Sequence, residues 1–282
     1  MEYTHQIEFK RHFPAEESET DIGRFISRIK PWILFLLIVV VYMLIISLGA
    51  MFGHQKLLNG IKEPETAIEA TVGSVLGLLA FILGFTFSLT WTRFANRNRM
   101  VIGHAKAIEV CYLRAGLVTE KQKLNVRRLL KEYTEILLGI QTGADREMSL
   151  ARIDEIHRLI WNETTSLAKE DIDSELRSLF ISSVNDMIGL SLERKIVTMF
   201  LRVPNAIWRS LFFLAAIGML AFGYQAGIFG ISRLFQLVLL PIAFALVMVL
   251  IADLNSQDLR RRFKVTQRPL MEVLALMEMD IS

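Results

Sequence analysis

Cysteine is almost absent from this sequence, and its scarcity removes several classes of site. Cys111 is the only cysteine in the 282 residues. A single thiol forms no disulfide within the chain and cannot supply a CxxC redox or zinc motif. We interpret Cys111 as a small packing residue of a helix rather than as a nucleophile.

Catalytic motifs are lacking as well. The five histidines are scattered, and no two of them are spaced three or four residues apart: His5, His12, His54, His104 and His157. No GxSxG, HExxH, Walker or GxGxxG pattern occurs. Because no nucleophile lies beside a base, we expect no enzymatic activity, no catalytic residue, no metal site and no cofactor.

Charged residues are missing from four long stretches of the chain. These stretches are Pro31 to Gly53, Ala70 to Thr92, Ser210 to Ser232 and Leu234 to Ala252. A helix needs roughly 20 apolar residues to cross the hydrocarbon core of a bilayer. The sequence therefore predicts an integral membrane protein with four transmembrane helices.

The distribution of basic residues predicts the orientation of these spans. Lysine and arginine gather before the first span, after the second, before the third and after the fourth, whereas residues 54–69 and the turn between spans three and four hold few. Cytoplasmic flanks carry the excess of positive charge. We expect both termini in the cytoplasm. Because the net charge of +3 has this membrane explanation, we expect the lipid bilayer and no nucleic acid as a partner.

The remaining polar sequence has helical spacing and no β-alternation. The second span is expected to continue as a helix to Tyr112. Thr119 and Gln122 resemble a capping box that opens a helix reaching about residue 140, and further helices are expected over 150–168 and 172–202. Leu270, Val273, Leu274 and Met277 form the apolar face of a tail helix, which we expect to pack on this block or on a neighbouring subunit.

These observations define an all-α fold class with five segments. The expected segments are a cytoplasmic N-terminal segment (1–30), spans one and two (31–92), a helical cytoplasmic region (93–205), spans three and four (206–252) and a cytoplasmic helical tail (253–282).

The second span has two different faces on a helical wheel. Small residues gather on one side: Gly73, Gly77, Ala80, Gly84 and Ser88. Phe81 and Phe85 lie at the edge of that side. Val75, Leu79, Ile82 and Leu89 lie roughly opposite, and we expect them to face lipid.

Two interpretations of the small face stay open on periodicity alone. In the first, Gly73, Ala80, Gly84 and Ser88 let other helices approach closely, and the phenylalanines fill gaps. In the second, several subunits place this helix around a central axis, where Phe81 and Phe85 form a hydrophobic constriction that gates by dewetting.

The second span also resembles a known signature. The run from Phe81 to Phe85, with Ser88-Leu89 and Thr92-Arg93-Phe94, is similar to the bestrophin pattern F-x-L-G-F-x-x-[ST]-L-x-x-T-R-W. Over residues 70–276 the chain resembles the bacterial bestrophin-like membrane proteins, which share its order of spans and helical block.

The resemblance implies a homo-oligomer, pentameric in bestrophins, with a chloride-conducting axial pore in the cytoplasmic membrane of a bacterium. It maps Phe81 and Phe85 onto two apolar neck positions of that pore. The third neck position is Gly77 here, where bestrophins carry a bulky aliphatic residue, and the proline that follows it is Leu78. A neck with glycine at one ring is wider or differently packed.

The inner ends of the second and fourth spans carry Arg93 and Asp253. Opposite charges that are partly desolvated at this depth tend to pair, although both residues could instead reach the headgroups and water. Animal bestrophins carry an acidic calcium site after the fourth span. Because only Asp253 and Asp258 are acidic in that segment here, we expect no calcium gating.

Two functions follow as hypotheses. One is a bestrophin-like anion channel or passive transporter with a pore lined by the second span. The other is a non-conducting membrane scaffold or signalling protein whose cytoplasmic helices bind a partner.

Overall fold

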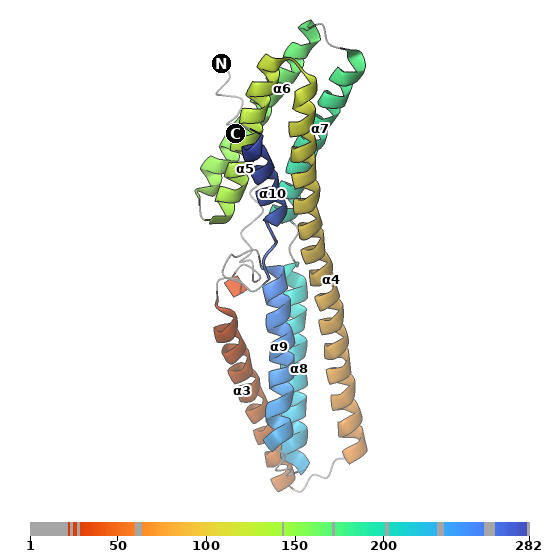
Figure 1. Ribbon diagram of the computed structural model, residues 1–282. Coiled ribbons are helices and arrows are strands. Elements are labelled where there is room, and N and C mark those ends of the chain that lie inside the picture. Colours follow the sequence, from red (N-terminus) through yellow and green to blue (C-terminus); the bar gives the residue numbers. More distant parts are fainter. Residues whose placement is uncertain are drawn as a thin grey trace, which may run out of the picture. The chain divides into compact units, whose positions relative to one another are not determined.

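The computed structural model describes residues 22, 25–26, 29–59, 64–142, 144–170, 173–200, 203–229, 234–256 and 263–280. Within these residues the chain forms helices and no strand. The principal helices, labelled in Figure 1, are α3 (Pro31–Leu58), α4 (Glu65–Arg114), α5 (Glu120–Thr142), α6 (Arg146–Ser166), α7 (Ser174–Phe200), α8 (Asn205–Phe229), α9 (Leu234–Asn255) and α10 (Arg268–Met279). The all-α prediction is confirmed for this part of the chain.

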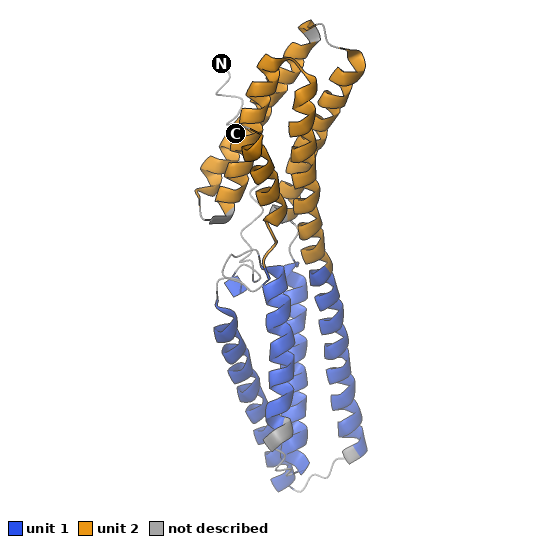
Figure 2. Cartoon of the chain, in the orientation of Figure 1, with its two compact units in different colours: residues 1–91, 202–263 blue, residues 92–201, 264–282 orange. Residues whose placement is uncertain are grey.

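The chain divides into two compact units that alternate along the sequence. One unit comprises residues 1–91 and 202–263, and the other comprises residues 92–201 and 264–282 (Figure 2). Helix α4 contributes to both, because it continues without a break from Glu65 to Arg114.

The first unit contains the apolar helices. Helices α3, α4, α8 and α9 are each long and apolar enough to cross a membrane, which confirms the four predicted spans. Prolines help to start two of them: Pro31 occupies the first turn of α3, and α8 begins directly after Pro204. Proline is favoured there because its missing N–H would be unpaired in any first turn.

Helix α3 packs against both α8 and α9 in this unit. Leu34, Tyr42, Trp208 and Met248 belong to its buried core. The ends of the helices are tied by asparagine side chains, since Asn255 accepts a hydrogen bond from the Val203 backbone N–H at 3.1 Å.

The second unit is a helical bundle made of the end of α4 with α5, α6, α7 and α10. Its buried core includes Ile108, Tyr112, Leu130 and Phe180. Cys111 lies within this core, and burial raises the pKa of its thiol to about 12. The thiolate form is therefore scarce at neutral pH, as expected for a packing residue.

The helix boundaries of this unit agree with the sequence pattern, but one capping interaction does not form. Gln122 donates to Ser166 Oγ at 3.2 Å and to Glu170 Oε1 at 3.4 Å. Its Oε1 has no hydrogen-bond partner among the described residues. The capping box expected between Thr119 and Gln122 is wrong, because the amide turns toward the end of α6 instead.

The tail helix α10 packs on this same unit. Leu270, Val273 and Met277 are buried in its core, so the predicted apolar face is confirmed. At the end of the helix, Asp280 accepts a hydrogen bond from the Tyr112 hydroxyl at 3.1 Å and forms an ion pair with Arg127. Polar and apolar contacts together hold the tail to α4 and α5.

Candidate functional site

The part of α4 that belongs to the first unit buries one of its faces there. Leu79, Leu83, Thr86 and Thr90 are nearly inaccessible. The two threonines satisfy their hydroxyls within the helix, since Thr86 donates to the Ile82 carbonyl at 2.8 Å and Thr90 to the Thr86 carbonyl at 3.0 Å. This internal bonding lets threonine lie in an apolar surrounding without an external partner.

The other face of α4 carries the two phenylalanines of the predicted neck. Phe81 is 72% exposed and Phe85 is 58% exposed. A Cβ built on Gly73, Gly77 or Gly84 meets no atom within 4 Å in the part of the chain that the structure describes. Ala80 and Ser88 are exposed on this helix as well.

This arrangement corrects the expected lipid face. Leu79 is 0% exposed, and a Cβ added to Gly218 of α8 would lie 3.7 Å from side-chain atoms of both Val75 and Leu79. The bulky side of the helix therefore packs against α8 of the same chain. A helical wheel separates two faces, but it does not reveal which of them the chain itself covers.

Close contacts between helix backbones in the described part of the first unit involve glycines of α3 and α8. Cβ atoms added to Gly49 and Gly53 of α3 would overlap the backbone carbonyl oxygens of Leu220 and Tyr224 in α8. Gly223 and Gly227 of α8 meet the backbone of α3 in the same way. Glycine at both positions of each pair lets the two backbones touch.

This contact had a signal in the sequence. Gly49 and Gly53 form a GxxxG motif in the first span, and Gly223 and Gly227 form another in the third. The glycines Gly73, Gly77 and Gly84 of the second span have no comparable neighbour among the described residues, so close packing through them would require a helix from outside the described chain.

The two predicted charges at the inner ends of the spans lie in different units. Asp253 is buried near the end of α9 in the first unit. Arg93 is half-buried on α4 in the second unit, and its Nη1 has no hydrogen-bond partner among the described residues. Their pairing stays a prediction.

The segment after the fourth span is described only in part. Asp253, Asn255 and Ser256 are buried, whereas Asp258 lies outside the described residues. Within the described ranges, no group of three or more His, Cys, Asp or Glu residues is placed to hold a metal ion.

The second unit brings together two histidines that the sequence keeps 53 positions apart. The Tyr133 hydroxyl lies 2.9 Å from His104 Nε2 and donates to Ser191 Oγ at 2.9 Å. The ring of His157 lies 5.2 Å from that of Tyr133. Because the three residues come from α4, α5 and α6, no local spacing motif could have found them.

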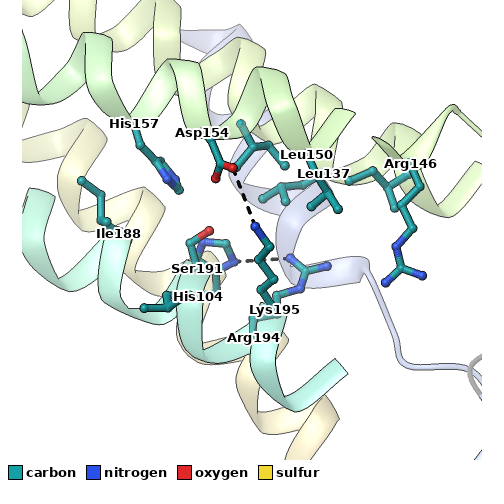
Figure 3. A pocket seen from close by; sticks show the side chains of 13 residues that line it. His104, Leu137, Arg146, Leu150, Asp154, His157, Ile188, Ser191, Arg194 and Lys195 are labelled. Carbon is teal, nitrogen blue, oxygen red and sulfur yellow. Dashed lines mark hydrogen bonds and ion pairs between the residues drawn. The ribbon is translucent and has the colours of Figure 1, made fainter. Parts of the chain in front are cut away.

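A cavity of about 310 Å³ adjoins these residues. Figure 3 shows basic side chains of α7, Arg194 and Lys195, beside it, with Leu137 and Leu150 on the neighbouring helices. Its volume is at the lower end of the range of about 300–1,000 Å³ that is usual for small-molecule sites. This cavity is a second candidate site, separate from the exposed face of α4.

Comparisons with known proteins identify the family and the fold. The family model of the Bestrophin-like domain matches residues 33–268. Among curated proteins, none matches this chain.

Solved structures share the fold at low sequence identity. A bacterial bestrophin homologue from Klebsiella pneumoniae superposes with a TM-score of 0.59 at 13% identity, covering 87% of this chain and 96% of its own. A single-residue variant of a Klebsiella pneumoniae homologue gives a TM-score of 0.61 at 13% identity, with 88% and 97% covered. A structure described as a membrane protein gives a TM-score of 0.62 at 15% identity.

The family match covers most of the chain, and the four apolar helices with their helical bundle reproduce the bestrophin fold. The chain is a membrane protein and belongs to the Bestrophin-like family.

Proposed function

We propose that this chain assembles into a homo-oligomeric anion channel or passive anion transporter whose pore is lined by α4. The observation that carries the proposal is the exposed pair Phe81 and Phe85, 72% and 58% accessible on a helix whose opposite face is buried in its own unit. Two large aromatic side chains on the uncovered side of a span suit a hydrophobic constriction formed by several copies.

The small residues beside this pair support the same arrangement. No described atom lies within 4 Å of a Cβ built on Gly77 or Gly84, so neighbouring subunits or the pore itself can occupy that space. With Gly77 at the outermost predicted ring, the neck would be narrowed by two aromatic rings rather than three bulky ones. A pentamer, as in bestrophins, is the oligomer we propose.

Chloride flux from liposomes tests the proposal. Purified full-length protein should release chloride when a gradient is applied, and the variant Phe81→Ala/Phe85→Ala should conduct at least several-fold faster because its constriction is wider and wets more readily.

A matched control exists on another apolar helix. Phe213 of α8 is 70% exposed, so Phe213→Ala removes an equally accessible ring outside the proposed neck and should leave the flux unchanged. Absence of flux from both the wild type and the double variant, together with particles that lack an axial ring in electron micrographs, would favour the non-conducting scaffold.

We further propose that the protein lies in the cytoplasmic membrane with both termini inside. The concentration of basic residues at the inner ends of the spans supports this orientation. A green fluorescent protein fused after Ser282 should fluoresce, and a cysteine introduced at Asn59 should react with a membrane-impermeant maleimide in intact cells. A fusion that does not fluoresce, together with a cysteine at Asn59 that is not labelled, would contradict this topology.

A further inference from the structure

The cavity beside His104 and His157 contains a positive charge that lacks a negative partner. Arg194 extends from α7 into it (Figure 3). Its Nη1 lies 3.3 Å from His104 Nδ1, and its Nη2 donates to Gln267 Oε1 at 3.4 Å. Both partners are neutral groups, and no ion pair to Arg194 is present among the described residues.

The neighbouring groups do not neutralise this charge. Asp154 is the acidic residue of the lining, and it already pairs with Lys195 at 3.7 Å. Arg146 adds a further positive charge. Burial keeps His104 neutral by lowering the pKa of its imidazole to about 3, and burial also lowers the pKa of His157. The cavity thus has an excess of positive charge.

An additional polar atom is unsatisfied here. His157 Nε2 is buried without a hydrogen-bond partner among the described residues. In Figure 3 the ring of His157 points into the region between α6 and α7, toward Ser191. Buried polar atoms are normally paired by protein, water or a ligand. A bound group with an oxygen atom would satisfy it.

Apart from Ser191, the rest of the lining is aliphatic. Leu137 and Ile140 contribute from α5, Leu150 and Ile153 from α6, and Ile188 from α7. An inorganic anion would leave this apolar surface in contact with water, whereas an organic anion would cover it.

We propose that this cavity is a binding site for a small organic carboxylate with an aliphatic body. The carboxylate lies against the guanidinium of Arg194. It also accepts a hydrogen bond from Nε2 of His157, in the tautomer that carries the proton on this nitrogen. The aliphatic body lies along the leucine and isoleucine side chains of α5 and α6. This inference concerns the second unit alone and does not depend on conduction by the first.

Isothermal titration of the full chain in lipid nanodiscs tests the site. The probe is hexanoate, compared with acetate, 1-hexanol and hexylammonium. Hexanoate should bind at one site per chain and at least tenfold more tightly than each of the other three, because only hexanoate combines a negative charge with an apolar body. Equal heats from hexanoate and hexanol indicate partitioning into lipid and overturn the proposal.

Two variants and a control locate the binding. Arg194→Gln should weaken the binding of hexanoate at least tenfold, since the carboxylate loses the positively charged guanidinium that hydrogen-bonds to it. Leu150→Trp should weaken the binding of hexanoate by a similar factor, because the larger side chain fills the cavity. This variant tests the site independently if Arg194→Gln fails to fold. Arg128→Gln removes an exposed arginine of α5 outside the lining and should bind like the wild type. Unchanged affinity in Leu150→Trp overturns the proposal.

Discussion

At the residue scale, His104 is a titratable group held in its neutral form. Burial lowers the pKa of its ring to about 3, and the positive charge of Arg194 and the ring of His157 add to the effect. Two neighbours lie within hydrogen-bond distance of it: the Tyr133 hydroxyl of α5 is 2.9 Å from Nε2, and Nη1 of Arg194 of α7 is 3.3 Å from Nδ1. Protonation would therefore place a second positive charge beside Arg194.

This environment predicts a loss of stability in acid. The unfolded chain takes up the proton near pH 6.5 and the folded chain near 3, so the contribution of His104 is complete above pH 6.5 and is lost as the pH falls below it. The slope is at most about 1.4 kcal/mol of unfolding free energy per pH unit. Thermal unfolding of the full chain should shift downward between pH 7.5 and pH 5.

The variant His104→Gln serves as the comparison. Glutamine can bond to Tyr133 without titrating, so the variant should lose stability less steeply over the same pH range. Identical slopes for the variant and the wild type would show that another group titrates in this window.

The surroundings of some residues could be predicted from the sequence, and those of others could not. Cys111 was interpreted correctly, because a lone cysteine with helical neighbours has few other roles. His104 and His157 were set aside, because local spacing is informative only when both ligands or both catalytic groups share one element. Their proximity depends on the packing of α4, α5 and α6, which no local pattern encodes.

At the element scale, the contact between α3 and α8 depends on glycine. A Cβ at Gly223 would overlap the carbonyl oxygen of Ile46 and approach its Cα to 2.9 Å. Backbone atoms cannot move aside as a flexible side chain can, so added volume here separates the two helices.

The variant Gly223→Ala should lower the free energy of unfolding by about 1–3 kcal/mol, the usual cost of overpacking. Gly189→Ala is the matched control, because it makes the same change in α7, where no described atom lies within 4 Å of the new Cβ. Thermal unfolding of the full chain measures both. Equal melting temperatures in the two variants would argue against a close approach of α3 and α8.

The helices themselves were largely predictable from the sequence. Runs without charge identified α3, α4, α8 and α9, and apolar spacing identified the helices of the second unit. The orientation of α4 was not predictable, because Leu79 on the bulky side and Gly77 on the small side are both compatible with lipid, with a neighbouring subunit or with the same chain. Only the position of α8 distinguishes these possibilities.

At the scale of the whole molecule, Arg93 and Asp253 belong to different units of the chain. We predict that they pair near the inner face of the membrane, since opposite charges that are partly desolvated attract strongly. Arg93→Ala should lower the thermal stability of the oligomer in detergent, whereas Arg99→Ala, an exposed arginine on the same helix, should not.

Charge reversal provides the stricter test of this pair. The double variant Arg93→Asp/Asp253→Arg should recover part of the stability that either single reversal loses. Additive losses in the double variant would mean that the two residues do not interact.

Because the first unit is discontinuous in the sequence, its helices are synthesised at different times. Its α3 glycines meet those of α8 only after about 170 further residues have been made, which takes roughly 10–30 s at ordinary rates of translation. During that interval the first span resides in the bilayer with its glycine surface uncovered, while the whole segment 92–201 emerges from the ribosome. Completion of the membrane unit therefore has to wait for the polar unit to be synthesised.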